Sequence, residues 1–152
     1  MERILDKNSG PTSGTAPGSL GQLVIADAKS SFEKLNDTEY LKSAMLEASK
    51  AGGLNIMDMD IHRFEPHGIT AIFVLKESHF SVHTWPEFGQ FSADIFSCGK
   101  EGDAPAAMKK FLEIMGADEK EVKRFERGVL RGDERAVSQA DAAREGSGVK
   151  EE

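Results

Sequence analysis

The pattern of apolar and polar residues along the chain has a helical period in one segment near the N-terminal side. Over residues 38–51, the apolar side chains recur every three or four positions, which places them on one face of a helix. Asp37 or Thr38 can cap the start of this helix, and Gly52-Gly53 can end it. We therefore expect an amphipathic helix that covers a sheet or another helix.

Other apolar segments have the alternation or the β-branched composition of strands. The segments predicted as strands are residues 22–28, 54–64, 69–75, 91–98 and 121–130. A second helix is predicted over 106–115, with Pro105 in its first turn. The turn residues at 65–68 join two of the strands closely, so those two should be antiparallel.

This order of elements predicts an α+β fold. We expect a two-layer α/β sandwich, with a mainly antiparallel sheet and the helices on one face. The other face of the sheet also carries apolar residues, which suggests a homodimer. The folded domain should span 19–130. Polar tails rich in small residues are expected at 1–18 and 131–152.

Composition and charge narrow the function classes. The chain has 152 residues and a formal net charge of −7, which argues against nucleic acid as the main partner. No apolar run is long enough to span a membrane, and no signal peptide is evident. Cys98 is the only cysteine, so no intramolecular disulfide can form, and we expect a cytoplasmic protein.

Reactive side chains gather at residues 76–87, with sequence KESHFSVHTWPE. Residue types alone leave several interpretations open. The segment could be an ordinary turn at a strand end, with Cys98 as a small buried hydrophobe. His79, His83 and Cys98 could bind a metal, although their spacing does not suit a helix broken by proline. A serine hydrolase centred on Ser78 is disfavoured, because no Gly-x-Ser-x-Gly motif is present.

The same segment, with two others, resembles the bacterial and archaeal S-adenosylmethionine decarboxylases, which make their own pyruvoyl cofactor. The resemblance runs from about residue 21 to residue 128. It is carried by three motifs in order: HRFEPHG at 62–68, ESH at 77–79 followed by HTWPEFG at 83–89, and DIFSCG at 94–99.

The resemblance implies that the chain cuts itself between Glu77 and Ser78. Ser78 Oγ would attack the carbonyl carbon of Glu77 and convert the amide to an ester. His83 would then accept the Cα proton of residue 78, and the second chain would begin with a pyruvoyl group. Thr70 stands where the family has a serine that polarises the scissile carbonyl.

The resemblance also implies the decarboxylation chemistry. The pyruvoyl group derived from Ser78 would form a Schiff base with the substrate amine. Cys98 would then protonate the substrate carbon that loses carbon dioxide. Phe64 would stack on the adenine, reaching the site of a neighbouring subunit, and Glu87 would bind the ribose hydroxyls. The expected product is decarboxylated S-adenosylmethionine, the aminopropyl donor for spermidine biosynthesis.

Some positions depart from the family pattern, so two alternative functions stay open. Gln90, Gln22 and Ala71 stand where the family often has Tyr, His and Gly. A pyruvoyl-dependent decarboxylase of arginine or ornithine is one alternative, although Phe64 and Glu87 favour the adenosyl substrate. A binding or activator protein that no longer cuts itself is another.

Overall fold

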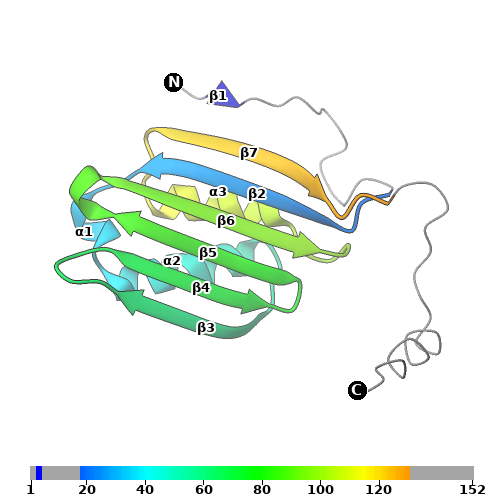
Figure 1. The fold of residues 1–152 in the computed structure, drawn as a ribbon, viewed down its shortest axis with the longest axis horizontal. Coiled ribbons are helices and arrows are strands. Elements are labelled where there is room, and N and C mark those ends of the chain that lie inside the picture. The colour runs from blue at the N-terminus through cyan, green and yellow to red at the C-terminus, as the bar shows by residue number, and fades with distance from the viewer. Residues whose placement is uncertain (1–2, 5–17, 131–152) are drawn as a thin grey trace, which may run out of the picture.

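One sheet organises the computed structural model, which describes residues 3–4 and 18–130. Within these residues the sheet has seven strands in the order β1-β7-β2-β6-β5-β4-β3. The strands are β1 (Arg3–Ile4), β2 (Gly21–Lys29), β3 (Ile56–Arg63), β4 (Ile69–Leu75), β5 (Ser78–Trp85), β6 (Gln90–Cys98) and β7 (Lys120–Arg127). All neighbouring pairs are antiparallel except β1 with β7. Figure 1 shows the sheet face-on.

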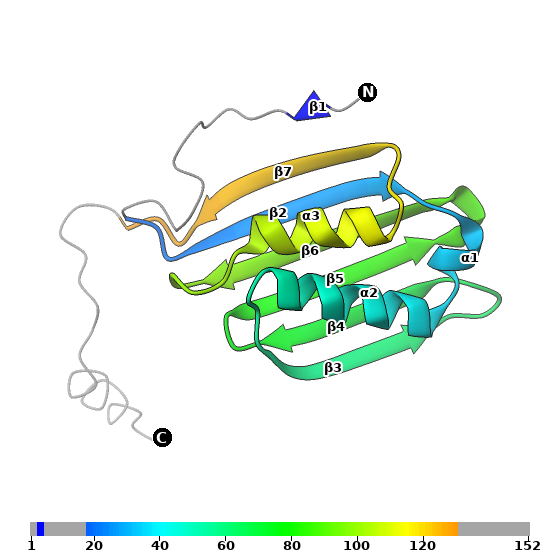
Figure 2. The same ribbon diagram turned by 180° about the vertical axis from the view of Figure 1, so that it is seen from behind.

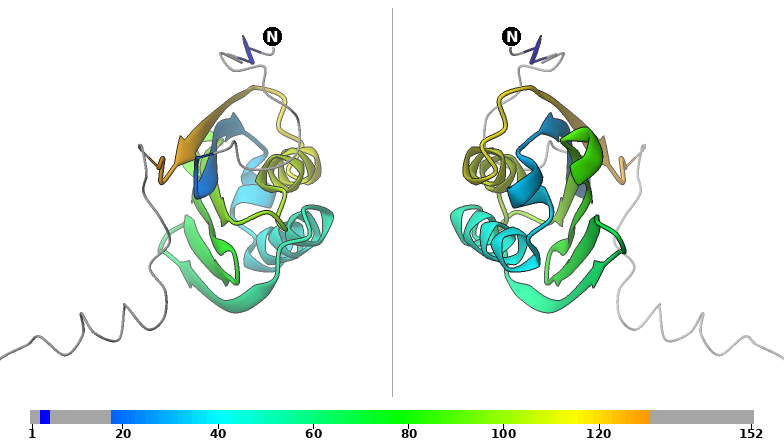
Figure 3. Two further views of the ribbon diagram at one scale, coloured as in Figure 1. Left: turned by 90° about the vertical axis from the view of Figure 1, so that its right-hand side faces the viewer. Right: turned by 90° about the vertical axis from the view of Figure 1, so that its left-hand side faces the viewer.

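Helices α2 (Thr38–Ala51) and α3 (Ala104–Ile114) lie side by side on one face of this sheet, as Figures 2 and 3 show. The two-layer sandwich predicted from the sequence is thereby confirmed. The Asp37 side chain accepts a hydrogen bond from the Tyr40 backbone N–H at 3.0 Å, and Gly52 caps the far end of α2. The predicted helix therefore begins and ends where its capping residues indicated.

The core fills the space between the helices and the sheet. Every second residue of the central strands points into it. The aromatic contacts centre on Phe111 of α3, whose ring lies 5.3 Å from Phe80 and 5.7 Å from Phe91 between centroids. Phe73 continues the cluster against Phe80, at 6.2 Å. Edge-to-face pairs of this kind help to hold strands β4, β5 and β6 in a fixed register.

Four elements within residues 3–4 and 18–130 were absent from the sequence-based prediction, namely β1, α1 (Phe32–Leu35), β5 and the 3₁₀ turn η1 (Pro86–Phe88). Strand β5 occupies 78–85, a segment that was interpreted as the end of a strand and a turn, and it runs between β4 and β6. Helix α1 is a single turn. The Thr84 hydroxyl donates to the Leu35 carbonyl at 2.8 Å and accepts from the Ile69 N–H at 2.9 Å, which ties α1 to the sheet.

The face of the sheet away from the helices is here called the open face. It carries exposed apolar side chains, including Ile72, Val74 and Phe125. Ile72 and Val74 lie opposite the polar residues Ser81 and His79 of β5, so the face mixes apolar and reactive groups. Among residues 3–4 and 18–130, no helix is both long and apolar enough to cross a membrane.

The tails predicted at 1–18 and 131–152 lie outside the described residues, except for the two residues of β1 and Gly18. The strand predicted over 121–130 is β7, which ends at Arg127. The helix predicted over 106–115 is α3, which begins two residues earlier, with Pro105 in its first turn as expected. The turn predicted at 65–68 joins β3 to β4.

Candidate active site

The Glu77–Ser78 bond lies at the exit of a tight hairpin. Strand β4 ends at Leu75 and β5 begins at Ser78, so only Lys76 and Glu77 form the connection. The Glu77 carbonyl oxygen accepts a hydrogen bond from the Cys98 backbone N–H at 2.9 Å. That N–H polarises the carbonyl that the resemblance identifies as the point of attack.

The side chain of Glu77 is held on the other side of the hairpin by Asn55. The Asn55 backbone N–H donates to Glu77 Oε2 at 3.0 Å, and Asn55 Nδ2 donates to Oε1 at 2.7 Å. Burial raises the pKa of Glu77, but these two hydrogen bonds, a backbone hydrogen bond from Glu77 itself and the charge of Lys76 together hold the pKa below its ordinary value. A buried, ionised carboxylate therefore fixes the residue that precedes the bond.

Ser78 is in contact with the next residue along the strand. Its Oγ lies 3.2 Å from His79 Nδ1, and His79 Nε2 lies 3.0 Å from Asp94 Oδ2 on β6. Asp94 also accepts a hydrogen bond from the Ser81 hydroxyl. The imidazole and the carboxylate are each more than a third exposed in the single chain.

Cys98 is exposed at the end of β6, one residue beyond Ser97, the register partner of Ser78. Its thiol is thus close to the cleavage point along the sheet and accessible from outside. The Ser97 hydroxyl is buried and has no hydrogen-bond partner among the described residues. Glu77, Ser78, His79, Asp94 and Cys98 are together called the cleavage end.

A second group of predicted residues lies toward the other end of β5. Thr70 Oγ1 and His83 Nδ1 are 2.7 Å apart. The His83 ring meets the rings of Trp85 and Phe64 edge to face, at 4.4 and 6.0 Å between centroids. Thr70, His83, Trp85 and Phe64 are called the His83 end.

Glu87 lies in the short turn η1 (Pro86–Phe88) that follows β5. Its carboxylate is 3.0 Å from His67 Nε2, a contact between the β3–β4 turn and η1. About a third of each of these two side chains is exposed, at 28% for His67 and 37% for Glu87. Glu87 therefore follows the end of β5 at which His83 lies, and its carboxylate remains accessible to a ligand.

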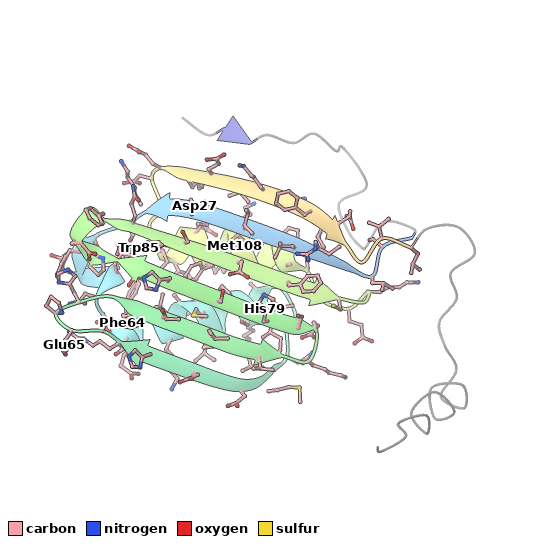
Figure 4. The ribbon with its side chains drawn as sticks, in the orientation of Figure 1. Asp27, Phe64, Glu65, His79, Trp85 and Met108 are labelled. Carbon is pink, nitrogen blue, oxygen red and sulfur yellow. The ribbon has the colours of Figure 1, made fainter. Side chains whose placement is uncertain are left out.

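The two ends do not meet within one chain. Ser78 and His83 are five residues apart on β5, which separates their Cα atoms by about 16 Å at the usual rise of about 3.3 Å per strand residue. Figure 4 shows His79 toward one end of the strands and Phe64 and Trp85 toward the other. Thr70 likewise contacts His83 and not the Glu77 carbonyl, which Cys98 contacts instead.

The sequence analysis assigned no role in cleavage to His79, Asp94 or Asn55, and it weighed His79 only as a possible metal ligand. His79 and Asp94 belong to the quoted motifs, so the motifs contained a signal for them. Asn55 had no such signal, because its contact with Glu77 follows from how the β3 edge folds beside the hairpin. Residues 3–4 and 18–130 hold no group of three or more His, Cys, Asp or Glu side chains placed to bind a metal ion.

Comparison with known proteins agrees with this geometry. The family model described as S-adenosylmethionine decarboxylase matches residues 22–128. The chain is 38% identical over 94 residues to the S-adenosylmethionine decarboxylase proenzyme of Prochlorococcus marinus, covering 62% of this chain and 75% of that protein. It is 35% identical over 112 residues to the proenzyme of the same name from Moorella thermoacetica, covering 73% of this chain and 90% of that protein.

A solved structure has the same fold. The crystal structure of the adenosylmethionine decarboxylase from Aquifex aeolicus superposes with a TM-score of 0.71 at 28% identity, covering 78% of this chain and 98% of that one. The matched family segment contains the hairpin, both ends of β5 and Cys98. The chain belongs to the S-adenosylmethionine decarboxylase family.

Proposed function

We propose that this chain is a self-processing, pyruvoyl-dependent decarboxylase of S-adenosylmethionine. The observation that carries the proposal is the arrangement around the Glu77–Ser78 bond. A serine hydroxyl follows the bond, and the carbonyl to be attacked already accepts the Cys98 N–H at 2.9 Å. Asn55 fixes the Glu77 side chain, so the acyl group is held while the bond to nitrogen breaks.

Self-cleavage proceeds in two stages that use only this protein and water. Ser78 Oγ attacks the carbonyl carbon of Glu77, the C–N bond breaks, and the product is an ester with a free amine on residue 78. A base then removes the Cα proton of residue 78, and the bond between Cβ and the ester oxygen breaks. The main-chain carboxylate of Glu77 leaves as the new C-terminus of the first chain. Hydrolysis of the remaining enamine releases ammonia and gives the pyruvoyl end. His83 is the proposed base.

The pyruvoyl group supplies a ketone that binds the substrate amine covalently and withdraws electrons as carbon dioxide leaves. The residues around Ser78 fit such a group, because the exposed Cys98 thiol borders the same hairpin. Cys98 is proposed to deliver a proton to the substrate carbon. The S–H group of a thiol can donate its proton to a carbanion.

The aromatic rings of the His83 end support S-adenosylmethionine as the substrate. Phe64 is 42% exposed and can present a ring face to a purine. Glu87 follows the same end of β5, is 37% exposed and can accept hydrogen bonds from ribose hydroxyls. Turnover of S-adenosylmethionine with carbon dioxide release supports this assignment. Turnover of arginine or ornithine alone would contradict it.

A homodimer reconciles the two ends of β5. In a two-fold dimer the same patch of each copy faces the other. If the open faces meet, the His83 end of one copy can lie over the cleavage end of its partner. The two copies would then be offset by about 16 Å, the distance along β5 between Ser78 and His83. The exposed apolar side chains Ile72, Val74 and Phe125 support burial of this face.

Intact mass under denaturing conditions tests the proposal. The wild-type protein should separate into chains of residues 1–77 and 78–152. The second chain should begin with a pyruvoyl group in place of Ser78 and should lack the α-amine. Ser78→Ala should give one uncut chain with the same fold by circular dichroism. A wild-type chain that stays whole, or a Ser78→Ala chain that is cut at the same bond, would contradict self-processing at Ser78.

A further inference from the structure

His79 and Asp94 continue a chain of polar contacts that begins at the Ser78 hydroxyl. The proposed mechanism assigns no role to these two residues. His79 Nδ1 is 3.2 Å from Ser78 Oγ, and His79 Nε2 is 3.0 Å from Asp94 Oδ2. A carboxylate can only accept hydrogen bonds, so Nε2 carries the ring proton. Nδ1 then has a free lone pair, which can accept the Ser78 hydroxyl proton.

The contacts around Asp94 fix this arrangement. The Ser81 hydroxyl donates to the second oxygen of Asp94, so the carboxylate is held at both oxygens. The ring of Phe96 lies 5.8 Å from the His79 ring between centroids and meets it edge to face. The order serine, imidazole, carboxylate is the one by which hydrolytic triads activate a serine.

The geometry points to His79 as the base that drives the first step of self-cleavage, with Asp94 as the residue that orients it. This inference rests on the proposed function and divides its proton transfers between two histidines. His79 acts on the Ser78 hydroxyl, within its own chain. His83, about 16 Å away along the strand, is left for the Cα proton in the second step.

The first step balances without any other reactant. Ser78 Oγ forms a bond to the Glu77 carbonyl carbon, and His79 Nδ1 takes the hydroxyl proton. The charge that develops on the Glu77 oxygen faces the Cys98 N–H. When the C–N bond breaks, the imidazolium returns the proton to the nitrogen of residue 78, which leaves as an amine. His79 is neutral again at the end of this step.

The main test replaces His79 with Gln, which keeps hydrogen bonding but cannot accept the proton. Full-length chains are made by cell-free synthesis, and the uncut fraction is followed over time by denaturing mass spectrometry. Cleavage of His79→Gln should slow about 10²- to 10⁴-fold, the usual contribution of general acid–base catalysis. His62→Gln, on β3 and on the same face, is the matched control and should be cut at the wild-type rate.

A second measurement isolates the first step. With His83→Ala the ester should form but not eliminate, and hydroxylamine, which opens esters and not amides, should cut the chain after Glu77. The double variant His79→Gln, His83→Ala should resist hydroxylamine. His79→Asn in the same background should resist it too, so the result does not depend on one substitution. Equal cutting of the single and double variants would overturn the inference.

Asp94 is tested by its dependence on His79. Asp94→Asn should slow cleavage on its own, but it should add nothing when His79 is already Gln, because a positioning residue acts only through its partner. Asp60→Asn, on the same face of β3, is the matched control and should have no effect. A full additional loss in the double variant would assign Asp94 a purely structural role and would contradict its action through His79.

The outcomes separate this inference from the proposed function. Wild-type protein cut at Ser78, with His79→Gln folded and nearly uncut, supports both. Wild-type and His79→Gln cut at equal rates leaves self-processing intact and removes His79 as the base. A wild-type chain that is never cut removes the proposed function and this inference with it.

Discussion

The cleavage end and the His83 end lie on the same strand and yet have different surroundings. At the cleavage end, one chain brings together the groups proposed to attack the Glu77 carbonyl: a hydroxyl, an imidazole with its carboxylate and a backbone N–H on the carbonyl. At the His83 end, His83 is within hydrogen-bond distance of Thr70 and contacts the rings of Phe64 and Trp85. The first arrangement suits bond breaking, and the second suits proton removal and ring stacking.

This difference indicates which steps need a second copy of the chain. In the proposed mechanism, ester formation requires only the cleavage end and should proceed within one chain. The proposed elimination and substrate binding require the His83 end, which lies about 16 Å of strand away from Ser78 of the same chain. Dimerisation would thus control the second stage of maturation and not the first.

The largest expected effects come from removing one reactive group at each end. Ser78→Ala and His83→Ala should both leave the chain uncut, but for different reasons. The first has no nucleophile and should be inert to hydroxylamine, whereas the second should hold an ester that hydroxylamine opens. Mass spectrometry before and after hydroxylamine distinguishes them. Identical behaviour of the two variants would mean that His83 acts before the ester forms.

Cys98→Ala separates two functions of one residue. The backbone N–H that contacts the Glu77 carbonyl remains, so self-cleavage should continue at close to the wild-type rate. The thiol is lost, so kcat for decarboxylation should fall about 10²- to 10⁴-fold, as for the loss of a general acid. Cleavage by mass and carbon dioxide release provide the two readouts. Undiminished kcat would exclude the thiol as the proton donor.

Asn55→Ala should weaken the cleavage end through Glu77. It leaves a buried carboxylate without its side-chain donor, which costs about 1–3 kcal/mol of folding free energy at neutral pH. The lowered pKa of Glu77 means that this contribution is present above the ordinary value of 4.5 and is lost as the pH falls through the folded-state pKa. Denaturant unfolding of the uncut Ser78→Ala protein, with and without Asn55→Ala, at pH 7 and pH 3 measures it. A difference that grows on acidification would contradict the assigned ionisation.

Phe64→Ala tests the His83 end with the smallest expected change. The loss of a ring that stacks on a base costs about 1–3 kcal/mol, and the lower end of that range corresponds to a rise in KM of about fivefold. Self-cleavage should continue, because Ser78, His79 and His83 are all retained and the Thr70 contact still holds the His83 ring. Initial-rate measurements with S-adenosylmethionine provide the value. A collapse of cleavage with unchanged KM would place Phe64 in processing and not in substrate binding.

The sequence predicted much of the fold, because its signals there were local. Helix α2 follows from an apolar face between Asp37 and Gly52. Strand β5 was overlooked because its alternation, Phe80 and Val82 against His79 and Ser81, was obscured by the chemistry of the motif. Most of its outward side chains, such as His79, Ser81 and His83, are polar, so hydrophobicity alone marked the strand poorly.

The candidate site was predictable as a set of residues but not as a geometry. The motifs name Ser78, His83 and Cys98, yet Ser78 and His83 lie five residues apart on β5, and Cys98 lies on β6 beside the Ser78 end. Recognising β5 as a strand would have predicted that separation. The Asn55 contact depends on the register between distant elements, and no local pattern carries that information.

Complementation between two inactive variants tests the shared site most directly. Ser78→Ala and His83→Ala chains carrying different tags are produced together in equal amounts. In a dimer with shared sites, a mixed pair joins the Ser78 of one chain to the His83 of the other. About half of the His83→Ala chains should then be cut, since random pairing places half of them in mixed dimers. If no chain is cut in the mixture, His83 must serve its own chain and the account of a shared site is wrong.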